Sequence, residues 1–338
     1  MDKLEALRAK LRKKQIEGTT DNALYPFWKT PIGKNCTLRF LPDKDPETPF
    51  FWVEKVTFKW AFPDNENPGK MVYITMPSIE TYEGPKTCPV TKELMPIYKD
   101  DKELCRKFWP KRAYLMQGFV RRGHFEEENP PENPIRIFTV NRELYKIIYD
   151  GIMEEDPDLK MDEFPVDFED GRDFIVKVKK DGEWPDYGTS QWAPNGSPLT
   201  DDELAAIEQH KLFSLKDRLP PRPSKAAFEM QLHMLNAGLN GEPWDPEWEE
   251  CWKPYRPDAV RGNNSSDEDE VVVKKTTVRK TVAKEEYVED DDIDIENDVD
   301  DVDDVDDVEN DDVEVTKPTK KTPEEILAEI RKKKSRTS

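Results

Sequence analysis

The sequence is poor in the residues from which active sites and metal sites are usually built. Its 338 residues include only three histidines and four cysteines, and neither type is clustered. It contains no glycine-rich phosphate loop, no nucleophile-elbow serine and no pair of histidines four residues apart. The paired carboxylates lie in polar loops or in the C-terminal tail, where solvation explains them better than acid–base chemistry. These absences argue against an enzyme.

Long apolar runs are also absent. No stretch approaches the roughly 20 residues that a membrane span requires, and the N-terminus lacks the pattern of a secretory signal. The cysteines are too widely spaced to suggest a disulfide framework, which indicates a reduced compartment. We therefore expect a soluble cytosolic protein with no membrane partner.

Negative charge is abundant but unevenly distributed. The formal net charge is -21, yet residues 285–314 alone hold about 19 Asp and Glu and no Lys or Arg. The rest of the chain therefore carries only about -21 + 19 = -2. Segments such as "DVDDVDDVEN" have too few apolar residues to offset the entropy of ordering them. We expect residues 257–315 to form a disordered acidic linker and tail.

Both ends of the chain carry a basic helical pattern. Residues 2–17 predict an amphipathic helix with leucines on one face, within a basic arm over residues 1–20. This arm is either a solvated cationic segment or a docking segment for nucleic acid or a neighbouring subunit. Residues 316–338 contain a capping box and predict a second short basic helix. The arm residues that would serve self-association are Arg8, Lys10, Arg12, Lys13 and Lys14.

Residues 21–256 carry the signals of a folded core. Helical patterns lie near residues 141–155, 200–216 and 224–238, and Trp244, Trp248 and Trp252 are spaced to pack one helix face onto the core. Short strands without regular helix alternation favour a small barrel or sandwich, in a β-rich α+β fold. The expected strands cover residues 35–41, 50–62, 70–76, 113–122, 134–140 and 173–180.

One segment is strongly basic in this acidic protein. "CRKFWPKRAYLMQGFVRRGHF", residues 105–125, holds six Lys and Arg, five aromatic residues and no acid. Cations that neutralise phosphates and rings that stack on bases are the two ingredients of a single-strand site. The alternative is that the rings are buried and the cations keep a sheet edge from pairing. A second strand, "DFIVKVKK", alternates Lys177 and Lys179 with apolar residues, which predicts one cationic face and one core face.

Several motifs resemble a known family. "TLRFLPDKDPETPFFWVEKVTF", "TCPV", "KRAY" and "DFIVKVKK" follow one another in the order found in the single-stranded DNA-binding proteins of T-even-type bacteriophages. The resemblance covers roughly residues 25–180, and the arrangement of arm, body and acidic tail extends it over most of the chain. It departs from the family at Leu115, where a second aromatic residue is expected.

The resemblance implies a five-stranded OB-fold core with added helices, whose cleft holds single-stranded DNA. It implies cooperative coating of unwound DNA in phage replication, recombination and repair, in the cytoplasm of an infected bacterium. The arm would contact the next monomer, and the acidic tail would recruit replication and recombination proteins. Together with the basic segments, it gives these predicted DNA-binding residues: Arg39, Arg106, Lys107, Trp109, Lys111, Arg112, Tyr114, Arg121, Arg122, Phe174, Lys177 and Lys179.

The family's zinc site is incomplete in this sequence. A structural zinc needs four nitrogen or sulfur ligands. Of the family's positions only Cys88 is retained, with Thr91 and Met76 standing where cysteines are expected. We therefore predict no cofactor and no zinc, with apolar packing and prolines holding the corresponding loop. The alternative function is an acidic interaction hub or chaperone-like protein that acts through its tail.

Overall fold

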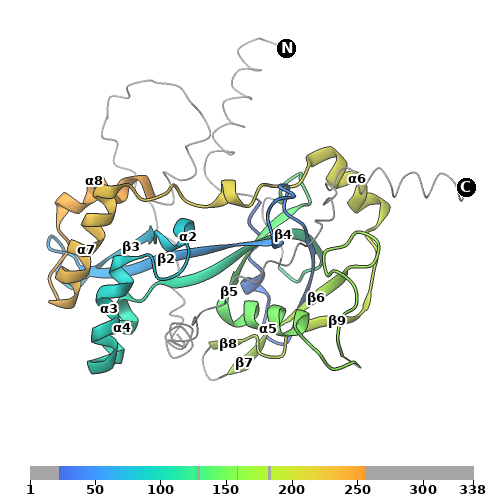
Figure 1. Cartoon of the computed structure of the whole chain (residues 1–338), viewed down its shortest axis with the longest axis horizontal. Helices are drawn as coiled ribbons and strands as arrows, with labels where there is room; N and C mark the ends of the chain where they lie inside the picture. The colour runs from blue at the N-terminus through green and yellow to red at the C-terminus, as the bar shows by residue number, and fades with distance from the viewer. Residues whose placement is uncertain (1–22, 126, 128–129, 158, 182–183, 256–338) are drawn as a thin grey trace, which may run out of the picture.

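The computed structural model describes residues 23–125, 127, 130–157, 159–181 and 184–255. The predictions for the N-terminal arm, the acidic tail and the C-terminal helix all lie outside these residues. The described part is a mixed α+β fold built on an antiparallel sheet (Figure 1). This is the fold class that the sequence predicted.

Six of the strands lie where the sequence placed them, to within about two residues at most ends. They are β1 (Asn35–Leu41), β2 (Trp52–Pro63), β3 (Met71–Pro77), β4 (Lys111–Arg122), β5 (Arg136–Asn141) and β6 (Arg172–Lys177). The sequence did not predict two others, β8 (Trp184–Asp186) and β9 (Gln191–Gly196), and its last strand continues into a separate β7 (Lys179–Asp181).

Strand β4 is the central strand of the sheet and pairs with β1, β2 and β5. Within the described residues the sheet has seven strands, ordered β3-β2-β4-β1-β6-β9, with β5 on the other edge of β4. Along one edge β4 pairs with β2 through Lys111 to Met116, and then with β1 through Gln117 to Arg122. β5 covers the opposite edge over Ala113 to Gly118. One long strand therefore joins two lobes.

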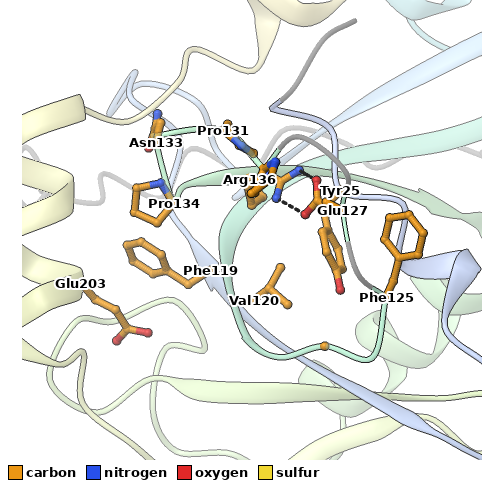
Figure 2. A pocket seen from close by; sticks show the side chains of 12 residues that line it. Tyr25, Phe119, Val120, Phe125, Glu127, Pro131, Asn133, Pro134, Arg136 and Glu203 are labelled. Atoms are coloured by element: carbon orange, nitrogen blue, oxygen red, sulfur yellow. Dashed lines mark hydrogen bonds and ion pairs between the residues drawn. The ribbon is translucent and has the colours of Figure 1, made fainter.

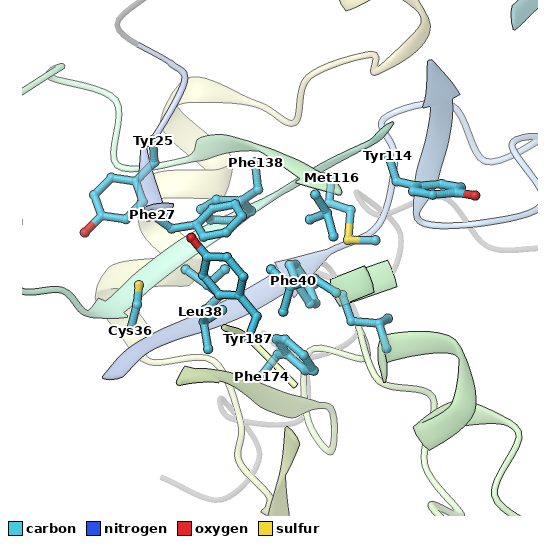
Figure 3. Close-up of a cluster of buried hydrophobic side chains, with 14 of the residues drawn as sticks. Tyr25, Phe27, Cys36, Leu38, Phe40, Tyr114, Met116, Phe138, Phe174 and Tyr187 are labelled. Carbon is cyan, nitrogen blue, oxygen red and sulfur yellow. The ribbon is translucent and has the colours of Figure 1, made fainter. Parts of the chain in front are cut away.

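The sheet lobe comprises β5, β4, β1, β6 and β9, together with α5 (Arg142–Ile152). Its core is aromatic: Phe40 is fully buried and lies 5.9 Å from both Phe138 and Phe174, measured between ring centroids (Figure 3). Leu144 and Ile148, one turn apart on α5, complete this core.

The helical lobe surrounds β3 and the far half of β2. Its helices are α2 (Glu80–Glu83), α3 (Pro89–Asp100), α4 (Lys102–Phe108), α7 (Lys225–Leu239) and α8 (Glu249–Trp252). Trp60 and Phe62 of β2 face this core, and Trp248 packs 5.2 Å from Phe62. The tryptophans near residue 248 thus hold the end of the body on the core, as predicted, although as a 3-10 turn followed by a short helix.

A connecting segment runs between the lobes. It contains α6 (Asp201–His210), which is shorter than the predicted helix over residues 200–216 and begins with a capping box of Thr200 and Glu203. The segment then crosses the top of the molecule in Figure 1 to reach α7. Leu215 packs with Val53 and Leu115 on the way and covers one face of the sheet there.

Candidate nucleic-acid interface

Five aromatic side chains form a continuous series on one face of the sheet. Phe50 stacks on Trp52 at 4.8 Å and 10°, and Tyr114 stacks on Tyr145 at 3.5 Å and 8°. Trp52 meets Tyr145 edge-on at 5.4 Å, and Tyr149 lies 6.1 Å from Tyr145. We call these five residues the aromatic ladder.

The ladder is buried in its middle and open at its ends. Phe50 is 56% exposed and Tyr149 is 44% exposed, whereas Tyr114 is only 8% exposed. Helix α5 sets the spacing of its tyrosines: Asn141 caps the helix by accepting a hydrogen bond from the Leu144 amide, which places Tyr145 and Tyr149 one turn apart. The exposed terminal rings offer faces on which further planar groups can stack.

The ladder face extends onto the helical lobe. Alternate β2 residues share a face, so Trp52 of the ladder and Trp60 under α4 point to the same side of the strand. Helices α4 and α5 accordingly both lie below the β2–β4 ribbon in Figure 1. Arg106 and Lys107, in the last turn of α4, are exposed beside this face.

Arg112 lies on the ladder face between two carboxylates. Its guanidinium donates to Glu54 at 2.8 Å and to Glu80 at 3.0 Å. Burial raises the pKa of Glu80, while Arg112 acts to lower it. Burial and the nearby Glu54 raise the pKa of Tyr114, so its phenol stays neutral. Arg112 thus balances local negative charge beside the rings.

The opposite face of the same ribbon carries lysines. The register pairs Thr57 with Lys111 and Lys59 with Thr75, so Lys55, Lys59 and Lys111 share one face. Tyr73, 49% exposed, lies opposite Ala61 on that face. Burial, followed by the charge of Lys59, lowers the pKa of Lys55. We call these three lysines with Tyr73 the lysine face.

Four of the predicted DNA-binding residues are buried, Tyr114 of the ladder among them, and burial rules out the predicted contacts of the other three. Trp109 is 3% exposed in the core of the helical lobe, and Phe174 is 1% exposed against Phe40 and Trp192. Neither ring has a face for a base. Arg39 is fully buried and donates to the Asp167 carbonyl at 2.6 Å, so it cannot reach a phosphate. Its pKa is lowered to about 10, chiefly by burial, so it remains charged at neutral pH.

Arg121 is also committed to the fold. It forms ion pairs at 2.8 Å with Asp173 and at 2.8 Å with Glu203, and it donates to Ser197 at 2.6 Å. These contacts tie β4 to β6 and to α6. The predicted phosphate contact of Arg121 is therefore replaced by a structural role.

The remaining predicted cations do not form one patch. Arg106 and Lys107 lie near the start of β4, and Arg122 lies at its end, about 36 Å away at roughly 3.3 Å per residue. Lys177 shares a face with Arg122 through β1, whereas Lys179 lies in the short β7–β8 pair. The predicted alternation of "DFIVKVKK" is confirmed, because Phe174 and Val176 are buried and Lys177 is half-buried.

The ladder could not be found by searching for a basic segment. Phe50, Trp52, Tyr145 and Tyr149 all lie outside residues 105–125, and only Tyr114 was predicted. One sequence signal did point to Trp52. Successive residues of "FFWVEKVTF" alternate between the two faces of the strand, so Trp52 shares the face of Glu54 and not that of the core residue Val53.

An open pocket of about 460 Å³ lies elsewhere, at the end of the sheet lobe (Figure 2). Phe119, Phe125 and three prolines line it, together with Tyr25 and Arg136. Arg136 is held by Glu127 at 2.6 and 2.7 Å, and it also donates to the Ala23 and Leu24 carbonyls. None of the predicted DNA-binding residues lines this pocket.

The residues around Cys88 do not fit a zinc ion. Cys88 is fully buried in an apolar cluster with Met76, Val90 and Leu94, and Cys105 points its thiol at the Leu94 carbonyl at 3.6 Å. Within the described residues, no three or more His, Cys, Asp or Glu side chains are grouped to hold a metal. In the same described residues, no helix is long and apolar enough to cross a membrane.

The fold and this surface define a β-rich binding protein that presents stacked rings with cations beside them. A family model described as gp32 DNA binding protein like matches residues 33–235, which is 203 of the 338 residues. The chain therefore belongs to the gp32-like DNA-binding protein family, whose members are binding proteins rather than enzymes. A search of curated proteins gave no match.

Proposed function

We propose that this protein binds single-stranded DNA along the ladder face and coats it without turnover. The observation that carries the proposal is the aromatic ladder with its exposed terminal rings, Phe50 and Tyr149. Unpaired bases stack on such rings regardless of sequence, at about 1 to 3 kcal/mol per base. Duplex DNA keeps its bases in its own stack, so the ladder would favour the single strand.

Phosphates would be neutralised by the cations beside the ladder. Arg106 and Lys107 are exposed on α4, and Lys146 is exposed on α5, at the two ends of the face. Each phosphate contact releases counterions into solution, which makes affinity fall with salt. The strand would therefore run from α4 across Arg112 to α5.

We also propose that the sheet lobe is an OB-type barrel. It supplies five antiparallel strands in the order β5-β4-β1-β6-β9, which agrees in number with the barrel that the resemblance implies. Strand β1 changes register between Thr37 and Leu38, a bulge of the kind that bends a strand into a curved sheet. The β2–β3 ribbon and the helical lobe would then be additions to the barrel.

Family membership also supports a proposal for the broader role. We propose cooperative coating of unwound phage DNA during replication, recombination and repair, in the cytoplasm of the bacterial host. Residues 1–20 would join neighbouring monomers, and the acidic tail would recruit replication and recombination proteins. The tail would also compete with DNA for the cationic residues when no strand is bound.

We propose further that the protein folds without zinc. The apolar cluster around Cys88 supports this, since the side chains that replace the expected ligands are Met76, which is buried there, and Thr91. Metal analysis of native, untagged protein should find well under one zinc per chain. One full zinc equivalent would contradict the proposal.

Tryptophan fluorescence tests the DNA-binding proposal directly. Titration with an unstructured oligonucleotide should quench emission, because Trp52 lies within the ladder, and equal amounts of duplex should quench far less. Trp52→Phe should retain binding measured by gel shift but lose most of the quench. The alternative, an acidic interaction hub, predicts binding to basic proteins and no gel shift with the oligonucleotide.

A further inference from the structure

The two central rings of the ladder lie face to face. The centroids of the Tyr114 and Tyr145 rings are 3.5 Å apart and their planes differ by 8°, so one ring lies almost directly above the other. Aromatic pairs in proteins prefer offset or edge-to-face arrangements with centroids about 4.5 to 7 Å apart. The other ring contacts of the ladder, at 4.8, 5.4 and 6.1 Å, keep to that range. The Tyr114–Tyr145 pair therefore has the arrangement that two like rings favour least.

This separation is close to the one that stacked bases adopt. Successive bases of a DNA strand lie about 3.4 Å apart along the helix axis. Tyr145 thus occupies the place that a base would take on the face of Tyr114. A base that replaced Tyr145 would keep the stacking contact and reduce the repulsion between two identical ring quadrupoles, because its charge is distributed differently. Tyr114 therefore offers a base-sized position that another side chain fills.

Tyr114 is fixed in the sheet, and the second ring covers it. On β4 it pairs with Glu54 of β2 along one edge and with Val140 of β5 along the other. Its side chain is buried, and burial is the main cause that raises the pKa of its phenol. A neutral phenol on a backbone held from both sides suits stacking better than ionic contact. A base can therefore reach this ring only if its cover moves.

The cover can move without the helix that carries it. Leu144 and Ile148 are buried in the core, and the Trp192 indole donates to the Ile148 carbonyl at 3.1 Å, so α5 is held in place. The Tyr145 side chain is half-buried on this helix. An aromatic side chain in a helix has two favoured χ1 rotamers, at about 180° and about -60°. Rotation between them swings the Tyr145 ring while the backbone stays where it is.

We propose that the face of Tyr114 is a nucleobase subsite, that Tyr145 fills it in the DNA-free protein, and that a base of the bound strand displaces the Tyr145 ring. The inference rests on the proposed function, because it assigns one base position within the ladder. Tyr145 is then a lid over the subsite, whereas Tyr149, one turn further along α5, is a stacking ring. Opening the lid costs free energy, which lowers the apparent affinity for the strand.

Two alanine variants of the full-length protein on the same helix separate a lid from a stacking ring. Tyr149→Ala should weaken binding of a short labelled oligonucleotide by about fivefold, because one stack is lost. Tyr145→Ala should tighten binding by about threefold, since no cover has to open. Alanine is the best helix former, so α5 should stay folded in both variants. Tyr145→Phe keeps the ring and should bind as the wild type does. Unchanged or weaker binding by Tyr145→Ala would overturn the proposal.

Nitration of tyrosines by tetranitromethane, located by mass spectrometry, gives a readout besides affinity. Without DNA, Tyr114 should be nitrated about threefold faster in Tyr145→Ala than in the wild type, because water and reagent reach its phenol. When the wild type binds the oligonucleotide, nitration of Tyr145 should rise as its ring leaves Tyr114, while nitration of Tyr149 should fall because a base covers it. A fall at both positions would show that Tyr145 is a stacking ring, and the proposal would be wrong.

Failure of the proposed function gives a different result. If fluorescence anisotropy showed no binding of the oligonucleotide by the wild type, single-strand binding itself would be overturned, and the assignment of a base to Tyr114 with it. The nitration of Tyr114 in Tyr145→Ala is measured without DNA and does not depend on that outcome. It therefore distinguishes a covered ring that takes no base from a ring that Tyr145 does not cover, and the second result alone also overturns the lid.

Discussion

The two faces of the β2–β4 ribbon differ in how they could hold a nucleic acid. The ladder face offers five rings, and its central cation, Arg112, is balanced by Glu54 and Glu80. The lysine face offers three lysines and one exposed ring. Stacking dominates on the first and charge on the second. The ribbon thus presents two different means of holding a single strand, stacking and charge, on its two opposite faces.

The largest expected effect on DNA affinity comes from removing the exposed rings of the ladder face. Phe50→Ala with Tyr149→Ala should weaken oligonucleotide binding by at least about 30-fold, since each lost stack costs about 1 kcal/mol or more. Both rings are exposed, so thermal stability should barely change. Fluorescence anisotropy with a short labelled oligonucleotide measures the loss.

Tyr73→Ala is the matched control on the lysine face, because Tyr73 is exposed to a similar degree. It should change affinity by less than about twofold. A loss at Tyr73 as large as that of the ladder variant would move the binding site to the other face.

The next effect concerns charge. Arg106→Gln with Lys107→Gln should weaken binding about tenfold at low salt and reduce the slope of log affinity against log salt by about 1.4, from roughly 0.7 per phosphate contact. Lys59→Gln with Lys111→Gln removes two cations from the lysine face and should leave the slope within about 0.3 of wild type. Equal slopes in the two variants would mean that both faces contact the strand.

The sequence predicted the strands of the fold better than its helices. The strand patterns were reliable because alternation along β1, β4 and β6 reports directly on burial. Helices α3 and α4 were missed: Pro96 lies inside α3 and the two helices are separated only by Asp101, so no uninterrupted helical period stands out. Local sequence patterns thus predicted most strands of the sheet but missed several helices of the helical lobe.

The site itself was harder to predict, for a physical reason. Phe174 and Trp109 are aromatic residue types that can stack on bases, but both lie in hydrophobic cores. The residue type alone does not distinguish an exposed stacking ring from a buried one. The ladder joins rings from β2, β4 and α5, and only tertiary structure brings each of these rings within 6.1 Å of a neighbouring ring. Arg121 illustrates the same limit, since its partners Asp173 and Glu203 are more than fifty residues away.

A smaller effect of opposite sign is expected at Glu54. Glu54→Gln removes a negative charge next to the rings and releases part of Arg112, so binding should tighten about threefold. The change should matter less at high salt, where screening weakens the repulsion. Glu66→Gln, in the exposed β2–β3 turn, is the control and should have little effect. Weaker binding by Glu54→Gln would show that Glu54 positions Arg112 rather than opposing the strand.

The smallest effect is a pH dependence that arises at Glu80. Burial raises the pKa of this carboxyl above its ordinary value, and Arg112 only partly opposes the shift. A bound phosphate nearby would raise the pKa further, so binding would be accompanied by proton uptake. Affinity should therefore increase, by about twofold, as the pH falls from neutral through the pKa of Glu80.

Glu80→Gln should flatten this pH profile while the variant stays folded by thermal melting, because Glu54 still pairs with Arg112. On the lysine face a pH dependence is expected at the opposite end of the pH range, because the lowered pKa of Lys55 would matter only as the pH rises. An affinity that falls between neutral pH and alkaline pH, with no change below neutral, would thus assign the strand to the lysine face instead of the ladder.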